Sequence, residues 1–128
     1  MQVMVPVSVG ELLDKITILE IKAERIAEPG KRVNIDRELS ELRACRDALG
    51  LERADLRPLL AELAEVNRRL WEVEDDLRRL EARQDFGPAF VSLARSVYRE
   101  NDRRAEIKRE LNRLTGSQLV EEKSYSAG

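Results

Sequence analysis

Two stretches of the sequence, residues 67–78 and 95–112, carry amide, aromatic and charged side chains at intervals of three and four residues. This spacing places the side chains of each stretch on one face of a helix. Groups of these types could bind an anionic metabolite, with amides forming hydrogen bonds, a cation neutralising charge and an aromatic ring forming a wall. The candidate ligand-binding residues are Asn67, Trp71, Glu74, Arg95, Tyr98, Asn101 and Lys108.

The same polar groups also have a structural interpretation. Buried between helices, they would form a hydrogen-bond network that fixes helix register and the number of partners. Each buried polar group left without a partner would cost ~1–3 kcal/mol. Glu100 and Arg104 fit either interpretation, because their spacing suits an ion pair within one helix. We favour the structural network and keep the ligand site as the alternative.

A further pair of cations, Lys15 and Lys22, lies seven residues apart among Leu and Ile residues. The two lysines share a helix face and could direct their charges at an anion inside the bundle, which makes Lys15 an eighth candidate for ligand binding. Lysines on an apolar helix more often extend their ammonium groups to solvent. Glu11, Asp14 and Glu20 could also pair with them.

Several kinds of chemistry are excluded by composition. The chain has no His and a single Cys, Cys45, which rules out a His/Cys zinc site, a disulfide framework and His-based catalysis. Without a His to activate it, Cys45 is interpreted as a packed thiol on an apolar stripe. The acidic run at residues 72–76 is scattered around a helix axis, and no Gly-rich phosphate loop is present. We therefore expect no metal and no cofactor, and the sequence leaves open whether the protein is an enzyme.

Charge and hydropathy bound the partners and the compartment. The 23 Lys and Arg residues against 25 Asp and Glu give a net charge of −2, which disfavours nucleic acid and anionic membrane as partners. No segment approaches the ~20 apolar residues needed to cross a bilayer. The lone thiol fits a reducing cytoplasm. We therefore expect a cytoplasmic protein. Its expected partner is a second copy, another helical protein or a small anionic ligand.

The first half of the chain predicts an extended segment and two helices. Alternating Val3, Val5 and Val7 around Pro6 indicate a short edge strand or extended arm, which could pair with residues 117–120. Ser8 and Glu11 form a capping box that starts a helix, and this helix should end at residues 28–30. A second helix is expected over residues 34–49, between an Asn34 cap and a left-handed Gly50.

The second half predicts a long antiparallel hairpin. Residues 57–84 repeat apolar side chains in alternating steps of four and three, the heptad seam of a coiled coil (Leu59, Leu63, Val66, Leu70, Val73, Leu77, Leu80). A fourth helix is expected over residues 88–114, before Gly116. The short connection makes the two helices antiparallel neighbours. A second apolar flank, formed by Leu60, Ala64 and Trp71, is wider than one neighbour covers and favours a homodimer.

Four segments resemble a family of small uncharacterised bacterial helical proteins, a domain of unknown function. They are VPVSVGELLDKITILEIK at residues 5–22, NRRLWEVEDDLR at 67–78, ARSVYRENDRRA at 94–105 and SQLVEEKSY at 117–125. The resemblance implies no reaction, substrate or cofactor. It includes the polar tail, and it therefore favours docking of Glu121, Glu122, Lys123 and Tyr125 on the body of the protein.

Together these patterns predict a mainly α protein with a single helical domain over residues 1–128. The expected architecture is a helical bundle built on the long antiparallel hairpin, with a short N-terminal extended segment at residues 1–8 and a polar tail at residues 117–128. The first functional hypothesis is a helical interaction or assembly module, as a homodimer. The alternative is a small helical enzyme or binder of an anionic metabolite, in the style of the all-helical chorismate mutases, which need neither His nor metal.

Overall fold

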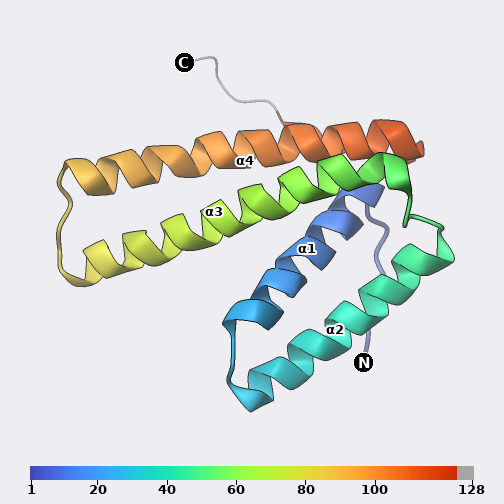
Figure 1. Ribbon diagram of the computed structural model, residues 1–128, viewed down its shortest axis with the longest axis horizontal. Helices are drawn as coiled ribbons and strands as arrows, with labels where there is room; N and C mark the ends of the chain where they lie inside the picture. Colours follow the sequence, from blue (N-terminus) through green and yellow to red (C-terminus); the bar gives the residue numbers. More distant parts are fainter. Residues whose placement is uncertain (124–128) are drawn as a thin grey trace.

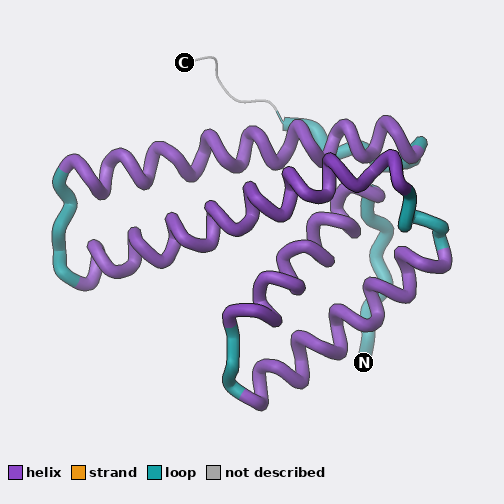
Figure 2. The backbone as a smooth tube through the Cα atoms, in the orientation of Figure 1, coloured by secondary structure: helices purple, strands orange, loops and turns teal. Residues whose placement is uncertain are grey.

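The computed structural model describes residues 1–123 and is built from four α-helices within that range. These are α1 (Val9–Arg25), α2 (Pro29–Ala48), α3 (Arg57–Ala82) and α4 (Pro88–Thr115), with a short 3-10 turn, η1 (Ala54–Leu56), before α3. Figure 1 shows α1 and α2 as one antiparallel pair and α3 and α4 as a second, longer one, and Figure 2 shows that only short loops join the helices. The prediction of a mainly α bundle on a long hairpin is confirmed.

The ends of α1 and α4 follow local sequence signals. The Ser8 hydroxyl accepts a hydrogen bond from the Glu11 N–H at 3.0 Å and caps α1 as predicted. The reciprocal half of the capping box does not form, because the Glu11 carboxylate turns to Lys108 instead. Gly116 (φ 66°) ends α4 and Gly50 (φ 65°) follows α2, both in the left-handed conformation that glycine adopts without steric cost.

The start of α2 differs from the prediction. The helix begins at Pro29, so Asn34 lies inside it and is not its cap. The Glu28 carboxylate caps the helix by accepting hydrogen bonds from the N–H groups of Gly30 and Lys31, both at 2.9 Å. Residues 28–30 were expected to end the preceding helix, but α1 ends at Arg25 and these residues begin α2, because proline is also favoured in the first turn of a new helix. Cys45, predicted to be packed, is exposed on α2.

The hydrophobic core lies where the two helix pairs cross. It is formed by the inner face of α1, one stripe of α2, the first half of α3 and the last half of α4. Its fully buried members include Leu13, Leu56, Leu63, Val66, Ile107 and Leu111. The core therefore fixes only one end of the α3–α4 hairpin against the rest of the molecule.

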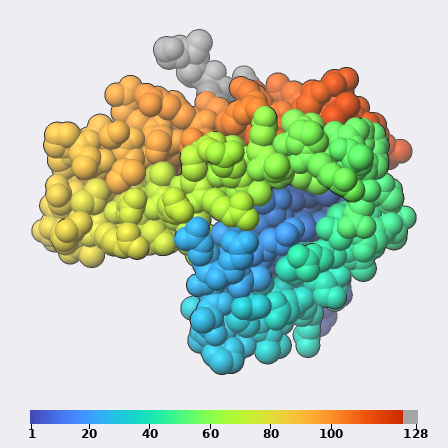
Figure 3. Space-filling view, in the orientation of Figure 1, coloured from blue at the N-terminus to red at the C-terminus, as the bar shows by residue number. Residues whose placement is uncertain are grey.

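The other end of the hairpin projects beyond α1 and α2, as Figures 1 and 3 show. No residue from 68 to 106, all of which the structure describes, is buried. We call residues 72–99 the overhang. The predicted apolar seam continues along it, but Val73, Leu77 and Leu80 reach only intermediate burial, whereas Leu63 and Val66 near the core are fully buried. Two helices alone cannot enclose a seam between them.

The N-terminal segment is extended but does not form the predicted strand. Val3, Val5 and Val7 are exposed, and no strand occurs in the described residues. Residues 117–120 approach the start of α1 through a side chain, since the Val9 N–H donates to the Ser117 hydroxyl at 3.1 Å. No helix in the described part of the chain is long and apolar enough to cross a membrane.

Candidate functional site

A fully buried carboxylate, Asp14, lies at the centre of the contact between α1 and the hairpin. The side chain of Asp14 has no exposed surface. Arg104 of α4 donates to it from Nε at 3.0 and 3.1 Å and from Nη2 at 2.5 Å, and Asn67 of α3 donates from Nδ2 at 2.9 Å. One carboxylate thereby joins three helices. A buried charge is tolerable only when it is paired and hydrogen-bonded in this way.

A second cation, Lys108, lies on the surface side of Asp14. We call Asp14, Asn67, Arg104 and Lys108 the Asp14 cluster. The Lys108 ammonium donates to Glu11 at 2.6 Å and to Glu121 at 2.8 Å, and it lies 4.0 Å from Asp14. Burial acts to lower the pKa of Lys108, but these hydrogen bonds and charges outweigh it and raise the pKa. Lys108 is therefore a fixed positive charge at any physiological pH.

The close approach of α1 to α4 depends on Gly10. The Gly10 N–H donates to the Asn112 side-chain oxygen at 2.6 Å. A Cβ atom at Gly10 would lie 2.6 Å from the backbone carbonyl oxygen of Lys108 and 3.0 Å from that Asn112 oxygen. Only glycine fits at this distance, so the first turn of α1 is held directly against the backbone of α4.

The acidic tail docks beside this contact. Glu121 accepts a hydrogen bond from the Ser8 hydroxyl at 2.5 Å in addition to its contact with Lys108. Glu122 lies 3.7 Å from Arg109, and Lys123 lies 3.8 Å from Asp102. Tyr125, the fourth tail residue expected to dock, lies outside the described residues.

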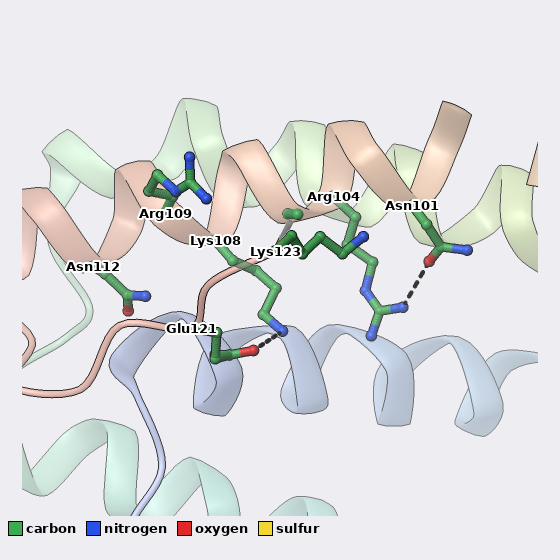
Figure 4. Close-up of a pocket in the computed structure, with 8 residues that line it drawn as sticks. Asn101, Arg104, Lys108, Arg109, Asn112, Glu121 and Lys123 are labelled. Atoms are coloured by element: carbon green, nitrogen blue, oxygen red, sulfur yellow. Dashed lines mark hydrogen bonds and ion pairs between the residues drawn. The ribbon is translucent and has the colours of Figure 1, made fainter. Parts of the chain in front are cut away.

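Two hollows flank Arg104. One, of about 170 Å³, lies between α4 and the tail and is shown in Figure 4; its lining includes Asn101, Arg104, Lys108, Arg109, Asn112, Glu121 and Lys123. The other, of about 260 Å³, is a groove in the angle between α1 and α3. Its apolar lining is Ile18, Ile21, Leu70 and Trp71, and its polar lining is Asn67, Glu74, Asp75, Arg78 and Arg104.

The structure brings together some of the predicted ligand-binding residues but not all. Asn67 and Lys108 belong to the Asp14 cluster, and Asn101 joins it by accepting from Arg104 Nη1 at 3.3 Å. Trp71 and Glu74 line the neighbouring groove. Three candidates lie apart from both: Arg95, Tyr98 and Lys15 are exposed.

The exposed face around Tyr98 is strongly cationic. The neighbouring guanidinium groups of Arg99, which lies over the ring at 5.8 Å from its centroid, and of Arg95 lower the pKa of the Tyr98 phenol.

The predicted pair of Glu100 with Arg104 does not form. Glu100 binds Arg69 of α3 at 3.1 Å, and Arg104 is committed to Asp14.

The two residues that organise the cluster, Asp14 and Arg104, were not among the predicted site residues. Both nevertheless leave a signal in the sequence. Asp14 interrupts the apolar run of the first helix, and Arg104 occupies an expected seam position of the last one. Opposite charges at apolar positions of two helices indicate that these helices meet there.

Docking of the tail should depend on pH through Glu121. Desolvation acts to raise the pKa of Glu121, but hydrogen bonds from Lys108 and Ser8 outweigh it and lower the pKa below the ordinary 4.5. Since this pKa is lower in the docked tail than in a free one, docking is favoured above pH 4.5 and weakens as pH falls through the lowered value. We expect NMR signals of residues 117–123 to move toward random-coil positions in acid while those of Leu63 stay fixed. Unchanged tail signals throughout the acid titration would contradict this ion pairing.

Comparison with known families gives one match. The model of a family of unknown function, DUF6165, matches residues 2–128. This range contains α1, the Asp14 cluster, the hairpin and the tail. No curated protein and no solved structure matches the chain.

Proposed function

The chain belongs to the DUF6165 family of unknown function, and we propose that it works as a helical assembly module that forms a homodimer through the overhang. One observation carries this proposal: no residue of the overhang is buried, although the apolar seam between α3 and α4 continues along it. Helices are stabilised in water mainly by burying such a face against a neighbour. We place the module in the cytoplasm, where a free thiol such as Cys45 persists.

The apolar side chains of the overhang support an interface. Phe86, Val91 and Tyr98 are 52%, 50% and 53% exposed. Phe86 and Phe90 pack edge to face at 5.2 Å and form a firm aromatic tip. Aromatic residues contribute disproportionately to protein interfaces because they bury a large area at a low cost in side-chain entropy.

Charge distribution supports a second copy as the proposed partner. The α3 side of the overhang, residues 72–82, carries five acids against Arg78 and Arg79, a net charge of −3. The α4 side carries two arginines, Arg95 and Arg99, and no acid over residues 88–99. An acidic and a basic surface on one molecule are complementary to themselves under a twofold axis, which brings α3 of one copy against α4 of the other.

The groove between α1 and α3 extends this surface. Its apolar lining includes Leu70 and Trp71, which lead directly into the overhang, and Glu74 and Asp75 provide the acidic rim. A second copy that lies along the overhang would cover the groove and face this rim with Arg95 or Arg99. Trp71 is the only tryptophan, so its fluorescence reports on coverage of the groove.

The test substitutes one exposed valine in the overhang and a matched one outside it. In the proposed dimer a glutamate at position 91 would face the acidic α3 side of the other copy, and this like-charge contact should make Val91→Glu weaken the dimer by about a hundredfold. Val33→Glu on α2 serves as the control, because Val33 is 61% exposed and lies outside the overhang. Light scattering should give a dimer for the wild type and for V33E and a monomer for V91E. Trp71 emission should shift to the blue as wild-type dimers form.

A wild-type monomer at about 100 μM would contradict the proposal, because a specific interface of ~800 Å² per partner is expected to hold at that concentration. Equal dimerisation of V91E and V33E would exclude the overhang as the interface.

A further inference from the structure

The cavity between α4 and the tail is lined by four cations. Arg104, Lys108, Arg109 and Lys123 line it, with Glu121 as the one carboxylate. Its volume of about 170 Å³ is below the ~300–1,000 Å³ typical of sites for drug-sized ligands. The cavity is therefore matched to a small anion.

We propose that this cavity is a binding site for a small dicarboxylate, and that Glu121 and Glu122 of the tail occupy its cationic positions as a built-in ligand. The proposal is independent of the dimer. Figure 4 shows the Glu121 side chain directed at the Lys108 ammonium, with the contact at 2.8 Å. The next residue, Glu122, places its carboxylate 3.7 Å from Arg109. Two neighbouring carboxylates thus meet two neighbouring cations, which is the arrangement a dicarboxylate would reproduce.

Three donors near the cavity are held by residues outside the tail, so they stay in place when the tail leaves. The Lys108 side chain is only 14% exposed, and Glu11 holds its ammonium from the opposite side at 2.6 Å. Arg104 is held by Asp14, and the Ser8 hydroxyl is positioned by its capping bond from the Glu11 N–H. Groups already held in place lose little entropy when a ligand binds, which favours affinity.

The tail is suited to leave this site. Residues 117–123 form no helix or strand and approach α4 mainly through charged side chains. An attached tail competes with a free ligand at an effective concentration in the millimolar range, as for a short flexible linker. A free dicarboxylate would replace the two tail carboxylates charge for charge. The intact chain should bind it weakly, and loss of the tail carboxylate should strengthen binding.

The experiment compares ligand affinity in two glutamate-to-glutamine variants of the full chain. Glu121→Gln removes the internal carboxylate and keeps the size of the side chain. Glu106→Gln is the matched control, because Glu106 lies on α4, is exposed and pairs with Arg103 instead of lining the cavity. Isothermal titration at constant ionic strength with succinate should give about tenfold tighter binding to E121Q than to the wild type or E106Q. Circular dichroism checks that the helices are intact.

Two further arms test the ligand class and the site. Acetate and inorganic phosphate should bind E121Q more weakly than succinate, since neither presents two separated carboxylates. Arg109→Gln, introduced into E121Q at an exposed position, should cancel the gain in succinate affinity. The proposal is overturned if E121Q and E106Q bind succinate equally, if phosphate or acetate binds as tightly as succinate, or if R109Q leaves the gain intact.

Discussion

Replacing Asp14 with alanine should lower the free energy of unfolding by about 3–5 kcal/mol, the cost of breaking a buried ion pair by removing one partner. The carboxylate is fully buried and accepts from Arg104 and Asn67. Its removal leaves a guanidinium and an amide facing an apolar space, and neither can turn fully to water. The measurement is urea unfolding followed by circular dichroism, with the midpoint and slope fitted together.

A matched control compares the removal of this buried carboxylate with the removal of an exposed one. Asp36 on α2 is exposed and forms only a 3.5 Å contact with Arg32 one helical turn away. Asp36→Ala should change stability by about 0.5 kcal/mol or less, as exposed pairs do. If Asp14→Ala lowers the free energy of unfolding no more than Asp36→Ala does, the Asp14 cluster does not hold the helices together.

Replacing Gly10 with alanine should destabilise the protein by about 1–3 kcal/mol, although alanine is the better helix former. The added Cβ would lie 2.6 Å from the Lys108 carbonyl oxygen, an atom of the α4 backbone that cannot rotate away. The first turn of α1 must then move, which lengthens the hydrogen bond from Gly10 to Asn112. Thermal unfolding of the variant measures the loss.

Gly30 provides the comparison, since it also lies in the first turn of a helix. A Cβ there would meet the end of the flexible Glu28 side chain at 3.0 Å. Gly30→Ala should be neutral or slightly stabilising, because alanine restricts the unfolded chain more than glycine does. A larger loss at position 30 than at position 10 would exclude the close approach of α1 to α4 as the cause.

The helices could be predicted largely from local sequence signals. The seam spacing located α3 and α4, and the short connection at residues 83–87 made them antiparallel. The early start of α2 was missed because Glu28 is not among the usual capping residues, which are Ser, Thr, Asp and Asn. Such a cap is recognised only when the carboxylate is seen to accept from Gly30 and Lys31.

The site was only partly predictable, because its geometry depends on how far the hairpin overlaps α1. Periodicity identified the polar faces of the two long helices, and Asn67, Asn101 and Lys108 do meet around one cluster. The charges of Asp14 and Arg104 at apolar positions mark where α1 and α4 meet. How far the hairpin then projects beyond that crossing, with Tyr98 on the projecting end, is set by long-range contacts such as that of Gly10 with α4, which local patterns do not encode.

The most direct test of the assembly proposal is a distance between two copies of the overhang. Ser92, an exposed residue of the overhang, is replaced by cysteine in a Cys45→Ser background and spin-labelled for pulsed dipolar spectroscopy. Each overhang helix is roughly 20 Å long at 1.5 Å per residue, so antiparallel packing should place the two labels within about 20–40 Å of each other. A defined distance in this range, lost on Val91→Glu, is the predicted result. The absence of any intermolecular dipolar signal from the labelled wild-type chain would contradict the account.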